Sequence, residues 1–237
     1  MQVSRRNFTK TLTTGAAGFM ILPRNVLGGK GHVPPSDKVN IALVGAGGQG
    51  QHNVRSLLQL DDIQIVSVTD PGRYWDLNNF YYKSIAGREP VCQMIEEHGR
   101  NHGNSKKVRQ FTRFHEMLEK QTDADAVLCA TPDHTHAYIT IASLKAGMHV
   151  FCEKPMAHNI WETRMVRKVV QETGLATQMG NVGHSADGMR STVEYLQDGA
   201  IGKVREIHAW VPATRWNAGI TGLPTESSPI PFGFDWE

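Results

Sequence analysis

The stretch VNIALVGAGGQG, residues 39–50, decides the fold class of this 237-residue chain. Residues 39–44 form a short run rich in β-branched apolar side chains, which is typical of a buried strand. The glycines that follow, Gly45, Gly47 and Gly50, have the spacing G-x-G-x-x-G, and a helical pattern comes directly after them. A strand, a glycine-rich turn and a helix in this order are the context in which the motif binds a dinucleotide.

Each glycine of the turn has its own physical reason in such a site. The first makes the tight turn, the second lets the backbone approach the pyrophosphate, and the third allows close packing of helix on strand. The helix N-terminus then favours the phosphate charge. Asp70 lies 20 residues after Gly50, where a carboxylate can accept hydrogen bonds from both ribose hydroxyls and repel a 2′-phosphate. This favours NAD, and NADP is the alternative because the Arg73 guanidinium is close enough in sequence to pair with that phosphate.

Strand-like and helix-like segments alternate along the rest of the chain. Short continuous apolar strands alternating with helices predict an α/β fold, a doubly wound parallel sheet covered on both faces, with right-handed crossovers. The long connection 73–105 carries five aromatic residues, and we expect a packed helical insertion there rather than an aromatic ligand cage. The expected strands are 39–44, 63–69, 108–111, 126–130, 149–152, 175–179 and 203–210, and the expected helices are 51–60, 114–120, 134–146, 160–172 and 188–198.

Composition excludes several classes of function. Apolar residues make up 40% of the chain and charged residues 20%, which is ordinary for a globular protein without a stable membrane span. The net charge of +2 is too small to predict nucleic-acid binding, and no basic tract is interleaved with aromatic residues. The three cysteines lack the CxxC spacing of a zinc site or a disulfide framework. Because Cys129 and Cys152 lie in apolar runs, we expect them to be buried thiols.

The N-terminus has the layout of an export signal. Paired arginines, Arg5 and Arg6, precede a short apolar run over residues 12–22, as in a twin-arginine signal. That run is shorter than the ~20 residues that a membrane-spanning helix needs. We therefore predict export to the periplasm or the cell exterior, with a basic N-terminus of a cytoplasmic protein as the alternative. Residues 28–37 have the composition of a linker.

Two polar segments follow the fourth and fifth expected strands. They are Thr131-Pro132-Asp133-His134-Thr135-His136 and Glu153-Lys154-Pro155. In doubly wound sheets such strand ends line the crevice that binds the ligand. The two histidines are two positions apart at a helix start and face different sides, so we expect no metal site. We expect Asp133 or Thr135 to cap the helix and one histidine to border the nicotinamide.

These two segments also carry a family resemblance. The stretch 131–136 and the stretch AGMHVFCEKP at 146–155 resemble the Gfo/Idh/MocA family, the glucose–fructose oxidoreductase and inositol dehydrogenase-like enzymes, with Met148 where the family usually has lysine. The resemblance extends from about residue 38 to the end of the chain. It implies a Rossmann domain followed by an α/β substrate domain with a large, mostly antiparallel sheet. It also implies hydride transfer between a nicotinamide cofactor and the hydroxyl of a sugar or polyol.

The resemblance assigns residues as well. It implies that Lys154 is the catalytic lysine, since an ammonium beside the reacting oxygen stabilises alkoxide charge and can relay a proton. It also implies that Pro155 follows a cis peptide bond. With the glycine motif, the predicted cofactor-binding residues are Gly45, Gly47, Gln49, Gly50, Asp70, Thr131, Pro132, His136, Glu153 and Asn181.

The resemblance further predicts how the chain is divided. We expect a signal and linker over 1–35, an NAD(P)-binding Rossmann domain over 36–157, and the start of the substrate domain over 158–237. The family's downstream acid/base pair in a G-D-x-x-x-H motif is not found. We therefore expect the chain to be truncated relative to the family, and a homo-oligomer only for a complete chain. Two other functions stay open: an NAD-dependent glycosidase of the same fold, and a nucleotide-binding fragment without catalysis.

Overall fold

The computed structural model describes residues 33–104, 106–210, 222, 225 and 227–235. The chain divides into two compact units, with the boundary between Lys38 and Val39. The first unit, as far as it is described, contains the 3-10 turn η1 over Pro35–Asp37. Most of the predicted signal and linker lies outside the described residues.

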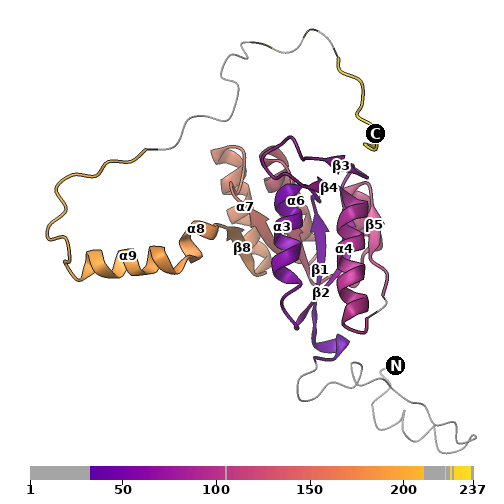
Figure 1. Cartoon of the computed structure of the whole chain (residues 1–237), viewed down its shortest axis with the longest axis horizontal. Helices are drawn as coiled ribbons and strands as arrows, with labels where there is room; N and C mark the ends of the chain where they lie inside the picture. The colour runs from indigo at the N-terminus through magenta and orange to yellow at the C-terminus, as the bar shows by residue number, and fades with distance from the viewer. Residues whose placement is uncertain (1–32, 105, 211–221, 223–224, 226, 236–237) are drawn as a thin grey trace, which may run out of the picture. The chain divides into compact units, whose positions relative to one another are not determined.

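The second unit contains a parallel six-stranded sheet (Figure 1). Its strand order is β5-β2-β1-β6-β7-β8, which is 3-2-1-4-5-6 when these strands are numbered along the chain. That is the order of a dinucleotide-binding Rossmann sheet. From β1 the strands are added on one side as far as β5 and then on the other side from β6 onward, so the order of strands reverses between β1 and β6 although all of them stay parallel. The strands are β1 Val39–Val44, β2 Ile63–Thr69, β5 Arg109–Phe111, β6 Ala126–Cys129, β7 His149–Glu153 and β8 Thr177–Gly180.

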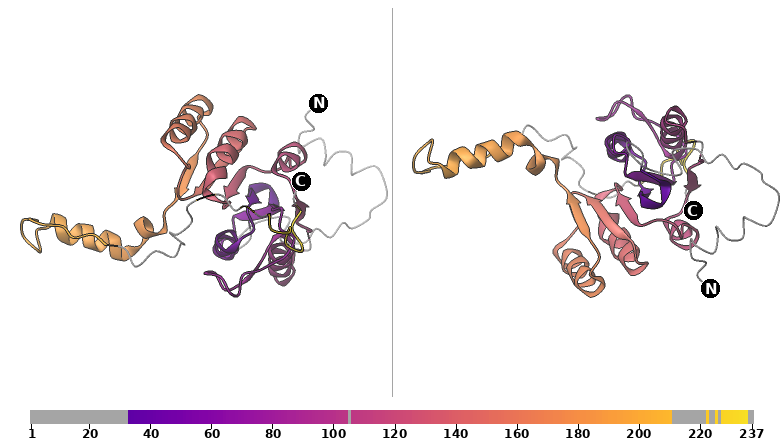
Figure 2. Two further views of the ribbon diagram at one scale, coloured as in Figure 1. Left: turned by 90° about the horizontal axis from the view of Figure 1, so that it is seen from above. Right: turned by 90° about the horizontal axis from the view of Figure 1, so that it is seen from below.

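Helices cover both faces of the sheet because successive side chains of a strand point to opposite sides. In β1, Leu43 packs into a cluster with residues of α3 and α4, whereas Ala42 and Val44 pack with residues of α5, α6 and α7. Figure 2 shows α6 and α7 on the opposite side of the sheet from α3 and α4. The helices are α3 Gly48–Leu57, α4 Arg88–Asn101, α5 Phe114–Lys120, α6 His136–Lys145 and α7 Ile160–Thr173.

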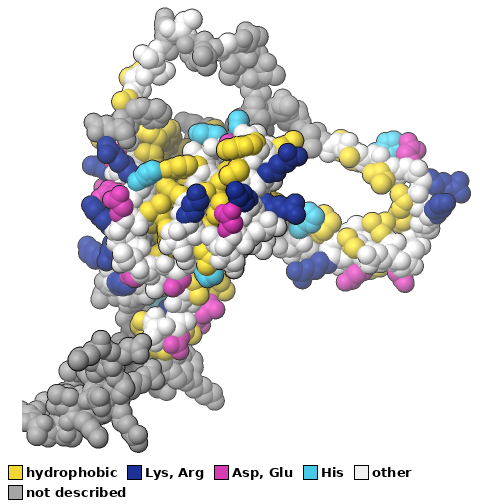
Figure 3. Space-filling model, turned by 180° about the vertical axis from the view of Figure 1, so that it is seen from behind, with side chains coloured by type: hydrophobic (Ala, Val, Ile, Leu, Met, Phe, Trp, Pro, Cys, Tyr) yellow, Lys and Arg dark blue, Asp and Glu magenta, His cyan; other side chains and the backbone are white. Residues whose placement is uncertain are grey.

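Local chemistry fixes both ends of α7. The Asn159 side chain accepts a hydrogen bond from the backbone N–H of Glu162, and Gly174 ends the helix with a positive φ of 66°. Ile160 and Trp161, in the first turn, are exposed. Hydrophobic and basic side chains lie side by side on the face seen in Figure 3.

Most of the expected elements are confirmed, and the differences have physical reasons. Helix α3 begins at Gly48, earlier than expected, because Gly47 already takes the N-cap position. Strand β8 pairs in parallel with β7, so the sheet continues beyond residue 157 to Gly180, and the division into domains stays a prediction. The expected strand over 203–210 is wrong: these residues are exposed and pair with no described strand, and apolar composition without a neighbouring strand does not make a sheet.

The insertion over 73–105 is only partly a packed helical segment. It contains a two-stranded hairpin, β3 Trp75–Asp76 and β4 Ile85–Ala86, followed by α4. Helix α4 is packed, but the five aromatic residues before it are exposed, since the hairpin is too short to cover them. They are Tyr74, Trp75, Phe80, Tyr81 and Tyr82.

Two further helices follow the sheet. They are α8 Val182–Ser185, which was not predicted, and α9 Asp187–Gln197. Neither has a buried residue. Among the described residues, no helix combines the length and the apolar character that crossing a bilayer requires.

Candidate nucleotide site

The glycine turn between β1 and α3 has the geometry that its sequence predicts. Gly45 has a φ of +96°, and a β-carbon there would lie 2.5 Å from the carbonyl oxygen of Ala130. A β-carbon on Gly50 would lie 2.0 Å from the carbonyl oxygen of Gly45. By contrast, a β-carbon on Gly47 would meet nothing within 4 Å. Two glycines are therefore required by packing, and the third borders an open space at the N-terminus of α3, the position at which this motif holds a pyrophosphate in dinucleotide-binding proteins.

Asp70, at the end of β2, reaches back to this turn. Its Oδ2 accepts a hydrogen bond of 2.6 Å from the backbone N–H of Ala46, and its Oδ1 accepts one of 2.7 Å from Gly72. Burial raises the pKa of Asp70, and the two backbone donors and the Arg88 charge oppose that rise. The carboxylate is thus held beside the glycine turn, at the place where an adenosine ribose binds in this fold.

Arg73, whose guanidinium made NADP the alternative cofactor, forms an ion pair in the structure. Its Nε lies 3.4 Å from Oε1 of Glu89 in α4. Both side chains are roughly half exposed, so the pair is accessible to solvent. To bind a 2′-phosphate, the Arg73 guanidinium would have to break or weaken its ion pair with Glu89. This ion pair therefore favours NAD.

Glu153, at the end of β7, is buried and connects the strand to α3. Its Oε1 accepts hydrogen bonds from Gln49 Nε2 at 3.2 Å and from Asn53 Nδ2 at 2.7 Å. A β-carbon on Gly180 would lie 2.8 Å from Glu153 Oε2, so that glycine is needed beside the carboxylate. Asn53 was not among the predicted residues, although its position four residues after Gln49 places both amides on one helix face.

Lys154 follows directly and is exposed. The peptide bond between Lys154 and Pro155 is cis, which confirms that prediction. Among the described residues, the Lys154 ammonium makes no hydrogen bond or ion pair, in contrast to its buried neighbour Glu153. It is therefore free to meet a ligand at this edge of the sheet.

His136 is 1% exposed and holds two strand ends together. Its Nδ1 lies 2.6 Å from the carbonyl oxygen of Pro155, and its Nε2 lies 2.8 Å from that of Thr131. Its contact with the nicotinamide stays a prediction, because both ring nitrogens already face the backbone. Any influence on a bound cofactor would pass through the two loops that the ring connects.

The other predicted residues lie at the same edge of the sheet. Thr131, half-buried just beyond β6, accepts a hydrogen bond of 2.7 Å from the Thr135 hydroxyl. Thr135 occupies the N-cap position of α6 without a side-chain capping bond, and Pro132 is exposed beside it. Asn181 follows β8, where it is exposed and takes the N-cap position of α8. The structure thus places every predicted residue at the carboxyl ends of the strands.

Cys129 and Cys152 are buried, as predicted, and lie opposite each other on β6 and β7. Hydrogen bonding from Cys152 lowers the pKa of Cys129. With His136 they form a group whose ligand atoms all lie within 4.8 Å, a spacing that could hold a metal ion. Because both His136 nitrogens face carbonyl oxygens, ion binding would require the ring to give up one of these contacts. Sequence spacing could not find this group, since strand pairing creates it.

Tyr82 is one of the five aromatic residues of the 73–105 insertion, for which we expected packing rather than a ligand cage. A β-carbon on Gly48 would lie 2.0 Å from the Tyr82 ring, so this ring packs directly on the N-terminus of α3. Its hydroxyl lies 3.4 Å from Gln49 Oε1. Gln49 and Tyr82 line a cavity of about 410 Å³ together with His52, Arg55 and Tyr81.

Comparison with known proteins agrees with this geometry. Residues 82–181 match the GFO_IDH_MocA model, described as an oxidoreductase family with an NAD-binding Rossmann fold. Solved structures of inositol dehydrogenases share the fold. The Rossmann fold and the cofactor type expected from the glycine turn are thereby confirmed at the level of the family.

Two relatives and one solved structure illustrate the likeness. The chain is 30% identical over 143 residues to the 4-carboxy-2-hydroxymuconate-6-semialdehyde dehydrogenase of Sphingobium sp., which covers 60% of this chain and 38% of the relative. It is 25% identical over 234 residues to a glycosyl hydrolase family 109 protein of Shewanella pealeana. That alignment covers 91% of this chain and 48% of the relative. One solved structure is that of scyllo-inositol dehydrogenase from Lactobacillus casei with NAD(H) and scyllo-inositol. It matches with a TM-score of 0.55 at 20% identity, and the match covers 70% of this chain and 42% of that one. This chain therefore spans less than half of the length of these relatives.

Proposed function

We propose that this chain supplies the nucleotide-binding part of an oxidoreductase that moves a hydride between NAD and a hydroxyl of a sugar or polyol. In this assignment the glycine turn and the N-terminus of α3 hold the pyrophosphate, and Asp70 holds the adenosine ribose. Glu153 and Lys154 face the nicotinamide half from the end of β7. When bound, the nicotinamide supplies or accepts the hydride.

One observation carries the proposal: the 2.6 Å hydrogen bond from the Ala46 backbone N–H to Asp70 Oδ2. It joins the turn after β1 to the end of β2, so the pyrophosphate and ribose subsites form one continuous surface. Each carboxylate oxygen keeps a second lone pair that a ribose hydroxyl can use. At the other end, the exposed Lys154 ammonium can stabilise an alkoxide and pass its proton to it, as a dehydrogenase requires.

A glycosidase is the second candidate, favoured by a specific observation. The glycosyl hydrolase family 109 protein of Shewanella pealeana aligns with 91% of this chain, more than the dehydrogenase relative does. Such an enzyme would oxidise a sugar transiently and reduce it again. It would release an aglycone without accumulating NADH, whereas a dehydrogenase would accumulate NADH.

The proposed function predicts that the purified chain binds NAD more tightly than NADP. Isothermal titration should show this preference, and Asp70→Ala should weaken NAD binding by about tenfold because the ribose hydroxyls lose a charged acceptor. Thr192→Ala, on exposed α9, is the control and should bind like the wild type. NADH absorbance at 340 nm with a panel of polyols, and the absorbance of nitrophenolate released from nitrophenyl glycosides, then separate the two candidate reactions. A wild-type chain that binds neither cofactor would disprove the proposal.

We also propose that the protein is exported by the twin-arginine route, from the Arg5-Arg6 pair and the apolar run after it. These residues lie outside the described part of the structure. Replacing both arginines by lysine should keep the protein in the cytoplasm, because this route reads the arginine pair itself. Cell fractionation and immunoblotting would measure the change. Equal amounts of both forms outside the cytoplasm would contradict the export proposal.

A further inference from the structure

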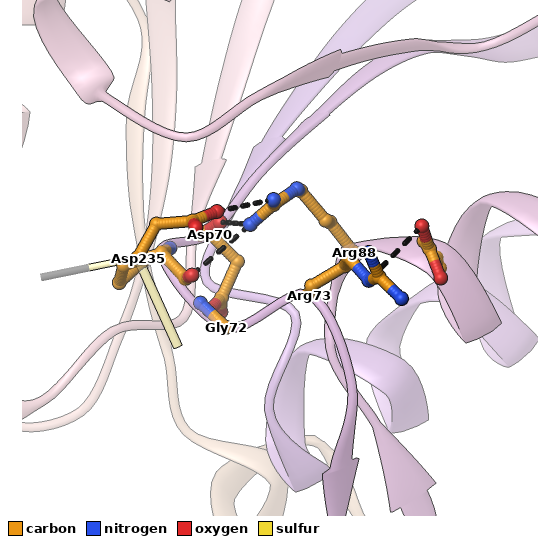
Figure 4. A network of polar contacts seen from close by, with 7 residues as sticks. Asp70, Gly72, Arg73, Arg88 and Asp235 are labelled. Atoms are coloured by element: carbon orange, nitrogen blue, oxygen red, sulfur yellow. Dashed lines mark hydrogen bonds and ion pairs between the residues drawn. The ribbon is translucent and has the colours of Figure 1, made fainter. Parts of the chain in front are cut away.

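Arg88, the first residue of α4, is buried against the turn that carries Asp70. Its Nη1 donates to the carbonyl oxygens of Asp70 and Pro71, each at 3.0 Å. Its Nη2 donates to Asp235 Oδ2, which lies 147 residues further along the chain (Figure 4). One guanidinium therefore connects the ribose-binding turn to a distant segment near the C-terminal end.

That segment also contacts the turn through its backbone. The Asp235 N–H donates to the carbonyl oxygen of Pro71 at 2.9 Å, and the Arg73 N–H donates to that of Gly233 at 2.6 Å. Phe234 forms an antiparallel bridge with Gly72. Its ring also packs edge-on against Trp75, with ring centroids 5.3 Å apart. The segment Gly233–Asp235 is thus docked on the turn by several independent contacts.

We propose that Arg88 and Asp235 are a positioning pair for Asp70, through which the segment Gly233–Asp235 sets both the affinity for the adenosine half of the cofactor and the preference for NAD over NADP. This rests on the proposed function, because it assigns a role within the same nucleotide site. Neither residue touches the reacting atoms, and both act through the backbone that carries Asp70.

The effect on position follows from the hydrogen bonds. Arg88 fixes the carbonyl groups of Asp70 and Pro71, and Asp235 fixes the orientation of Arg88. Removing Asp235 frees the guanidinium and the turn, and the Asp70 carboxylate is then less well placed for two ribose hydroxyls.

The effect on specificity follows from the charges. Two guanidiniums lie near the ribose-binding turn, and each has a carboxylate partner: Arg73 has Glu89, and Arg88 has Asp235. A 2′-phosphate would thus meet the Asp70 carboxylate and no unpaired cation among these residues. Removing the charge of Asp235 or Glu89 leaves one guanidinium unmatched and makes the turn more favourable to NADP.

The test is titration of NAD and NADP into the intact chain and four variants. Asp235→Ala removes both the contact and the charge, and it should weaken NAD binding by about tenfold. Asp235→Asn keeps a side chain of the same shape that can still accept from Arg88. It should leave NAD affinity near that of the wild type and shift the NAD-to-NADP affinity ratio about fivefold toward NADP. Glu89→Gln should shift this ratio in the same direction by freeing Arg73.

The control is Glu116→Gln, which breaks an exposed ion pair with Lys120 on α5. It should change neither affinity, and melting temperatures would show that every variant is folded. Unchanged NAD affinity in Asp235→Ala, or an unchanged affinity ratio in Asp235→Asn, would overturn the positioning pair while leaving the proposed function intact. A wild-type chain that binds neither cofactor would overturn both. If Asp235→Ala does not fold, the ratio measured for Asp235→Asn decides alone.

Discussion

Lys154→Ala should slow hydride transfer by about 10²–10⁴-fold, the usual size of a general acid–base contribution. The affinity for NAD should stay within a few-fold of the wild type. Lys154 is exposed at the carboxyl end of β7, whereas the residues that would hold the pyrophosphate and the adenosine ribose lie around β1, β2 and α3. The loss should therefore fall on the chemical step. Stopped-flow measurement of NADH formation and titration of NAD would separate the two effects.

Two matched variants make the Lys154 prediction sharper. Lys154→Arg keeps the positive charge but cannot release its proton near neutral pH, so it should recover charge stabilisation and not proton relay. Lys145→Ala removes an exposed lysine at the end of α6 and should behave like the wild type. Equal rates for Lys154→Ala and wild type, in a preparation that oxidises its substrate, would show that another group performs the proton transfer.

The parts of the site that could be predicted from sequence are those determined by neighbouring residues. The turn over 45–50 was identified from its glycine spacing together with the strand before it and the helix after it. Asp70 was found because a ribose-binding carboxylate ends the next strand of this fold. The cis bond before Pro155 came from the family resemblance and is confirmed.

The parts that could not be predicted depend on partners far apart in the chain. The contact of Asn53 with Glu153 spans 100 residues, and that of Arg88 with Asp235 spans 147. The pairing of Cys129 with Cys152 depends on which strands become neighbours. Single-residue patterns carry no information on such pairs. The same limit explains the error at 203–210, where an apolar pattern was taken for a strand although strand formation also requires a neighbouring strand.

Gly47→Ala and Gly50→Ala should both abolish tight NAD binding, but for different reasons. In Gly50→Ala the new β-carbon would lie 2.0 Å from the backbone oxygen of Gly45, which cannot move without opening the turn. We expect a loss of about 1–3 kcal/mol in the free energy of unfolding, as for other overpacked positions. In Gly47→Ala the new β-carbon would meet nothing within 4 Å, and the backbone there has an ordinary φ of −73°.

The stability of Gly47→Ala should therefore stay within about 1 kcal/mol of the wild type, the size of an N-cap effect. Its affinity for NAD should still fall by more than about tenfold, because the added methyl group would occupy space into which the pyrophosphate must come. Chemical denaturation and titration of NAD on the same samples give both quantities. Gly188→Ala, on exposed α9, is a control that should change neither, since its β-carbon also meets nothing within 4 Å. Wild-type affinity in Gly47→Ala would mean that the pyrophosphate does not approach this glycine, and the nucleotide would then have to be placed elsewhere along the edge of the sheet.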